Sequence, residues 1–174
     1  AALPRRAQDE QHVLVADAES GHARNLHPVL ANGAAEELEL RLAAEIQRGL
    51  LPKDRPSCGD FEIAAESVPS LHVGGDYFDF ILLADGRLGL TISDVAGKGV
   101  SASLLMASLR AALHSEVRPS ARIDAMAAKL NDFVQRSSAI NAFITFFYGE
   151  LNTESGAFVF VNAGHNHPFI LDVS

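Results

Sequence analysis

The sequence is poor in cysteine and in basic residues, and both shortages restrict what the protein can be. Cys58 is the single cysteine among 174 residues, so the sequence offers no internal disulfide and no cysteine-based zinc cluster. The 14 lysines and arginines are outnumbered by 22 acidic residues, which gives a formal net charge of −8. This charge argues against nucleic acid and against an anionic membrane as main partners. A phosphorylated partner is still compatible, because bound divalent ions would reverse the local field.

Long apolar runs are also missing. No segment approaches the length of a transmembrane helix, and no signal peptide is recognisable. We therefore expect a cytoplasmic protein. Hydrophobic residues make up 48% of the sequence and charged residues 21%, which is typical of a globular domain. Because the chain begins Ala-Ala-Leu-Pro rather than with Met, we expect that it was cut from a longer protein.

Two aspartates framed by glycines are the most informative feature that is present. Asp76 ends a Gly-Gly-Asp motif at residues 74–76, and Asp94 opens an Asp-Val-Ala-Gly-Lys-Gly motif at residues 94–99. Each lies at the edge of an apolar run that is typical of a strand. The glycines allow the backbone to bend sharply and leave room for an ion or a phosphate to approach.

A tight turn between the two motifs predicts that they meet. Residues 85–86, Asp-Gly, are a strong signal for a two-residue hairpin turn between the apolar runs at 77–84 and 87–93. In such a hairpin both aspartates lie at the same end of the sheet. Neighbouring carboxylates are hard oxygen ligands, which suit Mg²⁺ or Mn²⁺ rather than zinc. The pair favours a metal site, whereas each aspartate alone is equally well explained as a turn residue that ends a strand.

The N-terminal part divides into two segments. Residues 1–33 carry little pattern and are interpreted as a linker or the remnant of an upstream domain. Residues 34–52 predict a helix whose apolar positions recur at every fourth residue, namely Leu38, Leu42, Ile46 and Leu50. Pro52 ends this helix, because the residue before a proline is pushed out of the helical region. Residues 36–51 either pack on their own domain or pair with a second copy as a short coiled coil, which would make a homodimer.

Residues 53–174 have the pattern of one further domain. Beside the hairpin we expect strands at 61–68, 142–151, 157–161 and 168–172, and helices at 100–117 and 123–136. Strands followed by two helices and then by further strands indicate an α+β domain rather than a parallel α/β one.

With these residues in place, the chain resembles the bacterial PPM-type serine/threonine phosphatases of the SpoIIE/RsbU kind. The resemblance covers roughly residues 35–172 and keeps the order of the family's motifs. It rests on residues 45–52 (Glu-Ile-Gln-Arg-Gly-Leu-Leu-Pro), 73–79 (Val-Gly-Gly-Asp-Tyr-Phe-Asp), 93–100 (Ser-Asp-Val-Ala-Gly-Lys-Gly-Val), 104–106 (Leu-Leu-Met) and 162–165 (Asn-Ala-Gly-His).

The resemblance implies a fold for residues 53–174. It would be a PPM-like sandwich of two antiparallel sheets packed face to face, with helix pairs outside, in α-β-β-α layers. The family's domain continues with a further strand region and an acidic Asp-Gly motif that supplies another metal ligand. This sequence stops at Ser174, and Asp172 has no glycine beside it. We therefore expect that the domain is truncated at its C-terminus, which leaves the activity of this polypeptide open.

The resemblance also implies a reaction. Asp76, Asp94 and the backbone carbonyl of Val95 would hold two Mn²⁺ or Mg²⁺ ions, which activate a water molecule to attack a phosphoserine or phosphothreonine. The substrate would be a phosphorylated, STAS-like anti-sigma-factor antagonist in a bacterial stress or sporulation switch. An upstream sensory domain would control the enzyme. Two alternatives are a non-catalytic phosphatase-like binding module and a hydrolase that acts on small phosphate esters.

Other polar residues carry weaker signals. Asp79 follows Asp76 by three residues, which on a strand places it on the opposite face and favours a structural role. Lys98 could meet a phosphate at a helix start, or it is a solvated loop lysine. His165 could donate a proton or orient water, or it is a loop histidine held by backbone hydrogen bonds. Thr145 has the pattern of an ordinary strand residue.

Overall fold

The computed structural model describes residues 14–16, 23–25, 28–68, 72–138 and 142–169 of the chain. The chain divides into two compact units, Ala1–Leu42 and Ala43–Ser174. In the first unit, strand β1 (Leu14–Ala16) pairs with strand β2 (Ala23–Asn25) in antiparallel fashion. Within the described residues, no helix has the length and apolar character needed to cross a membrane.

Helix α1 (Pro28–Leu50) starts in the first unit and ends in the second. It begins upstream of the predicted residue 34, because a proline is well tolerated in the first turn of a helix, where its missing N–H has no partner to lose. Its end agrees with the prediction and is explained by Pro52. In the second unit, Ala44 of this helix is buried, whereas the side chain of Ile46 is 69% exposed.

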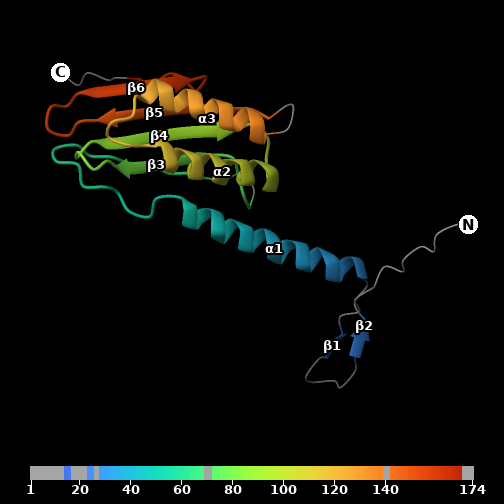
Figure 1. The fold of residues 1–174 in the computed structure, drawn as a ribbon. Helices are drawn as coiled ribbons and strands as arrows, with labels where there is room; N and C mark the ends of the chain where they lie inside the picture. Colours follow the sequence, from blue (N-terminus) through green and yellow to red (C-terminus); the bar gives the residue numbers. More distant parts are fainter. Residues whose placement is uncertain (1–13, 17–22, 26–27, 69–71, 139–141, 170–174) are drawn as a thin grey trace, which may run out of the picture. The chain divides into compact units, whose positions relative to one another are not determined.

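The second unit is built on a four-stranded antiparallel sheet with the order β3-β4-β5-β6 (Figure 1). The strands are β3 (Tyr77–Leu82), β4 (Leu88–Val95), β5 (Ile144–Leu151) and β6 (Phe158–Ala163). The predicted hairpin between β3 and β4 is confirmed, but its loop has three residues, 84–86, rather than two, because the N–H of Leu83 donates to the carbonyl of Arg87 at 2.9 Å. Gly86 has a φ of 85° and its N–H donates to the carbonyl of Leu83 at 3.0 Å. Glycine adopts this left-handed conformation without steric cost.

Two helices cover one face of the sheet (Figure 1). Helix α2 (Val100–Glu116) packs on β3 and β4, and helix α3 (Ile123–Ser137) packs on β5 and β6. Both occupy nearly the predicted ranges, because their apolar stripes match the helical period. The buried core between helices and sheet contains Tyr77, Val95, Met106, Leu109, Leu113, Met126, Leu130, Phe146 and Tyr148. The α+β class is confirmed.

The opposite face of the sheet also carries apolar side chains, because successive residues of a strand point to alternate faces. The ring centre of Phe147 lies 6.4 Å from that of Phe158 and 5.4 Å from that of Phe160. These two β6 rings are 41% and 50% exposed. The described residues of the second unit form no second sheet, so the face-to-face sandwich stays a prediction.

The strand predicted at 61–68 is wrong. The structure describes this segment and shows only an isolated bridge between Cys58 and Phe61. An apolar run becomes a strand only where a neighbouring backbone can satisfy its N–H and C=O groups, and here no such ladder forms. Residues 168–169 form no strand either, and the rest of the strand predicted at 168–172 lies outside the described residues.

Candidate active site

The hairpin brings the two predicted aspartates together. Asp76 immediately precedes β3, and Asp94 is the next-to-last residue of β4. Tyr77 pairs with Ser93 in the ladder, so the aspartates on either side of this pair are neighbours. Burial raises the pKa of Asp76, and the charge of Asp94 and hydrogen bonding with its carboxyl raise it further. Two carboxylates that repel each other in this way form a site that a cation would stabilise.

Gly75 keeps the backbone beside the aspartates tightly packed. A Cβ atom at this position would lie 2.7 Å from the carbonyl oxygen of Val95 and 2.9 Å from its Cβ. The Val95 side chain is buried, so it cannot give way easily. Only glycine allows the loop that leads to Asp76 to approach this carbonyl so closely, and this carbonyl is the predicted backbone ligand.

A cavity of about 490 Å³ opens over the aspartate pair. Asp76, Asp94 and His165 line it, together with the segment 64–68 and Asn166. Both aspartate side chains are accessible from this space. The cavity is therefore placed to admit a ligand that contacts the two carboxylates and the histidine at once.

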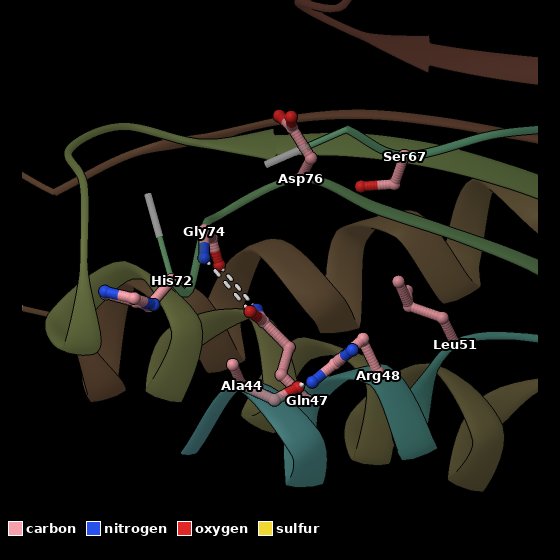
Figure 2. A pocket seen from close by; sticks show the side chains of 8 residues that line it. All are labelled: Ala44, Gln47, Arg48, Leu51, Ser67, His72, Gly74 and Asp76. Atoms are coloured by element: carbon pink, nitrogen blue, oxygen red, sulfur yellow. Dashed lines mark hydrogen bonds between the residues drawn. The ribbon is translucent and has the colours of Figure 1, made fainter. Parts of the chain in front are cut away.

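The C-terminal end of α1 holds the loop that leads to Asp76. The Gln47 side chain donates from Nε2 to the carbonyl of Gly74 at 2.6 Å, and its Oε1 accepts from the N–H of Gly74 at 3.0 Å (Figure 2). Both bonds join residues of the second unit. A separate cavity of about 390 Å³ lies beside this contact and also reaches Asp76 (Figure 2). The motif at 45–52 indicated the segment, but its pattern gave no role for Gln47.

His165 is held by polar contacts from two strands. The ring nitrogen Nδ1 lies 2.8 Å from the hydroxyl of Thr145 on β5. The backbone N–H of His165 donates to Oδ1 of Asn162 on β6 at 2.8 Å. The Asn162 amide in turn donates to the His165 carbonyl at 3.1 Å. The prediction for Thr145 was incomplete, because this strand residue also holds the histidine ring.

Asp79 has a structural position, as its spacing predicted. It is buried, and Oδ2 accepts from the hydroxyl of Tyr77 at 2.8 Å and lies 2.7 Å from Nε2 of His114. The guanidinium Nε of Arg110 is 3.5 Å from the same oxygen. Since Arg110 and His114 belong to α2, this carboxylate ties the helix to β3. Burial, and then the charge of this carboxylate and the hydrogen bond to it, raise the pKa of Tyr77 well above its ordinary value.

For the remaining candidate residues, the structure gives weaker indications of a role at the site. Lys98 is exposed in the loop before α2, between Gly97 and Gly99, both with positive φ. Cys58 is buried and its thiol donates to the carbonyl of Phe61 at 2.9 Å, so it is not presented as a nucleophile. In the part of the chain that the structure describes, no three His, Cys, Asp or Glu residues cluster in a way that could hold a metal. The two aspartates are thus joined by no third side chain of these kinds.

Residues 84–174 match the family described as stage II sporulation protein E (SpoIIE). The chain belongs to this family, which confirms the resemblance to PPM-type phosphatases of the SpoIIE/RsbU kind.

Among named relatives, the chain is similar to the phosphoserine phosphatase RsbU of Bacillus subtilis. The two are 31% identical over 151 residues, which cover 86% of this chain and 44% of RsbU. Protein IcfG of Synechocystis is 30% identical over 162 residues, covering 78% of this chain and 26% of IcfG. The chain therefore spans less than half the length of either relative.

A crystal structure of the RsbU and RsbW domains of Rv1364c from Mycobacterium tuberculosis is also similar. It is 32% identical with a TM-score of 0.49, and the match covers 56% of this chain and 27% of that one.

Proposed function

We propose that residues 53–174 belong to the catalytic domain of a metal-dependent phosphatase that hydrolyses phosphoserine or phosphothreonine on a partner protein. The observation that carries this proposal is the meeting of Asp76 and Asp94 in an accessible cavity, with the pKa of Asp76 raised by burial and by the charge of Asp94. Membership of the SpoIIE family supports it.

The residues at this site fit divalent ions. Two facing carboxylates supply the hard oxygen donors and negative charge that Mn²⁺ and Mg²⁺ prefer. Because Gly75 has no Cβ, the backbone next to Asp76 can lie close to the carbonyl of Val95. Asp76, Asp94 and the Val95 carbonyl would therefore hold two such ions. When bound, the ions would supply activation of a water molecule and neutralisation of the phosphoryl charge.

The protein's own residues set up this chemistry before any substrate binds. The paired bonds from Gln47 fix the backbone two residues ahead of Asp76. The β3–β4 ladder fixes Asp94 against it. Site geometry that is set in advance lowers the cost of ordering the reactants. The cavity is open to solvent, which suits a phosphorylated side chain carried on another protein.

The family context suggests a partner. We infer that the substrate is a phosphorylated, STAS-like anti-sigma-factor antagonist, in a cytoplasmic signalling switch, as the resemblance to RsbU implies.

We also infer that the helix segment 36–51 can pair with a second copy. The 69% exposure of Ile46 supports this pairing. Light scattering on the full-length protein tests it, and a strict monomer would contradict it.

Phosphate release from a phosphoserine peptide tests the proposed function. The full-length protein should release phosphate with Mn²⁺ and should stop after a chelator is added. A nucleotide and a sugar phosphate, assayed in parallel, test the alternative of a small-ester hydrolase, which predicts faster turnover of these compounds. If the full-length wild type releases no phosphate from any of them, the enzyme proposal is wrong.

The competing hypothesis is a binding module that recognises its partner without hydrolysis. It is favoured by one observation, that no third acidic or histidine side chain joins the aspartate pair among the described residues. Calorimetry with Mn²⁺ separates the two. Two binding sites, the tighter with a Kd in the micromolar range or below, favour the enzyme, and no detectable binding favours the module.

A further inference from the structure

His165 faces the same cavity as the aspartate pair from a different part of the sheet. It lines this cavity just beyond the end of β6, whereas the aspartates belong to the β3–β4 hairpin. A positive charge on its ring would lower the pKa of Asp76, against the effects of burial and of Asp94. Yet the described residues form no three-residue cluster that could ligate a metal. Among these residues the ring therefore shares the cavity with the aspartates without completing a three-residue metal cluster.

The ring orientation is set by the strand next to Asp94. Thr145, whose hydroxyl lies 2.8 Å from Nδ1, is the register partner of Asp94 in the β4–β5 ladder. One rung of the sheet therefore places both the carboxylate and the group that holds the imidazole. A shift of one strand against the other would change the position of the ring relative to the Asp94 carboxylate.

The backbone at His165 is equally constrained. The Asn162 side chain bonds the N–H of His165 at 2.8 Å and its carbonyl at 3.1 Å. Gly164 adopts a φ of 74° and bridges to Phe146 on β5. A side chain that is fixed at both its ring and its backbone is preorganised to contact a ligand.

The contact with Thr145 leaves the other ring nitrogen for a ligand. No hydrogen bond to Nε2 is found among the described residues. In the neutral ring, a Thr145 hydroxyl that donates to Nδ1 leaves the ring proton on Nε2. In the imidazolium both nitrogens carry a proton, so Nδ1–H donates to the Thr145 oxygen and Nε2–H is again free to donate. The charged groups that line the cavity otherwise are Glu66, Asp76 and Asp94, all acidic. An N–H donor in this setting suits an anionic oxygen brought in by a ligand.

We propose that His165 is a substrate-binding residue, which donates from Nε2–H to an oxygen of the substrate's phosphoryl group, and that Thr145 positions its ring. This role rests on the phosphatase function proposed above. It assigns the recognition of a phosphate monoester to a side chain that lies outside the predicted metal ligands.

Kinetics with a phosphoserine peptide and the full-length protein test the role of the ring. His165→Phe keeps a flat ring without nitrogens and should raise KM by about tenfold or more, because a hydrogen bond to the charged phosphoryl group is lost. His165→Gln keeps a side-chain N–H donor and should recover part of the loss. Thr145→Val should show a smaller increase in KM, and Thr145→Ser, which keeps the hydroxyl, should resemble the wild type.

A spectroscopic readout separates binding from turnover. In ¹⁵N spectra of the imidazole rings with Mg²⁺, inorganic phosphate should shift the Nε2 resonance of His165 and leave its Nδ1 resonance nearly unchanged. The resonance is assigned by its loss in His165→Gln, since the chain has 7 histidines. Calorimetry should show unchanged Mn²⁺ affinity in His165→Phe, because the ring is not a ligand.

The outcomes distinguish this inference from the proposed function. A wild type that releases no phosphate contradicts the phosphatase function itself. An active wild type in which His165→Phe keeps normal KM and normal inhibition by phosphate contradicts only the role of His165. A large loss of Mn²⁺ affinity in His165→Phe also contradicts it, because the ring would then act through the ions.

Discussion

The side-chain amide of Gln47 binds both backbone groups of Gly74, with N···O distances of 2.6 and 3.0 Å, two residues before Asp76. A helix terminus is thereby fastened to the loop that carries a predicted metal ligand. No other kind of side chain offers a donor and an acceptor in this planar arrangement except asparagine, which is shorter. The contact explains why the motif at 45–52 and the motif at 73–79 belong to one site.

Gln47→Leu should release the Gly74 loop. The substitution leaves an N–H and a carbonyl without their partner, so the free energy of unfolding should fall by about 1–2 kcal/mol. Hydrogen exchange should show faster exchange of the Gly74 amide. Glu45→Gln, an exposed change on the same helix, is the matched control. Unchanged protection of Gly74 in Gln47→Leu would show that the contact does not hold the loop.

Gly75→Ala should disturb the site through the backbone. The new Cβ would lie 2.7 Å from the Val95 carbonyl oxygen, so the loop at residue 75 or strand β4 must move. The free energy of unfolding should therefore fall by about 1–3 kcal/mol. Mn²⁺ binding should weaken at the same time. The control is Gly49→Ala in α1, where nothing lies within 4 Å of the new atom, and where the helix should gain about 0.5–1 kcal/mol. Thermal unfolding and calorimetry measure both effects, and a Gly75→Ala protein with wild-type stability and metal affinity would contradict the tight packing.

Asp79→Ala should loosen α2 from the sheet. The buried carboxylate accepts from Tyr77 and contacts His114 and Arg110, and its removal should cost about 2–3 kcal/mol. Denaturant unfolding gives the value. Asp132→Ala, at an exposed position of α3, should leave stability nearly unchanged. Equal effects of the two substitutions would mean that the Asp79 contacts do not anchor the helix.

Asp76→Asn should stabilise the metal-free protein slightly. The folded-state pKa of Asp76 is raised, so ionisation disfavours the fold, and stability is lost as pH rises through this raised value. Removing the charge should raise the melting temperature at neutral pH. The gain should disappear below about pH 4, where the carboxyl is protonated even in the unfolded chain. A melting temperature that falls at neutral pH in metal-free buffer would contradict the repulsion between the two carboxylates.

The parts of the fold that the sequence predicted are those decided by local chemistry. Asp85 and Gly86 specify the turn between β3 and β4 almost alone, and the apolar periods at 100–117 and 123–136 specify α2 and α3. The segment 61–68 was assigned wrongly because its apolar residues resemble a strand, while the presence of a pairing partner depends on distant parts of the chain.

The same distinction holds for the site. The proximity of Asp76 and Asp94 could be predicted from the sequence, because one short hairpin joins them. The link between Thr145 and His165 could not, since it depends on the pairing of β4 with β5 and of β5 with β6. The role of Gln47 could not be predicted either. Its contact with Gly74 joins a helix to a distant loop, and no periodic pattern in the sequence indicates such a contact.

The most direct test of the two-aspartate site is Mn²⁺-dependent phosphate release by Asp94→Asn in the full-length protein. The amide keeps the shape of the side chain but removes a full negative charge from a site proposed to hold two divalent ions. Turnover should fall by about a thousandfold or more, while Glu62→Gln, an exposed change outside the site, should leave it near the wild-type rate. An Asp94→Asn protein that releases phosphate at close to the wild-type rate would contradict the site and the function derived from it.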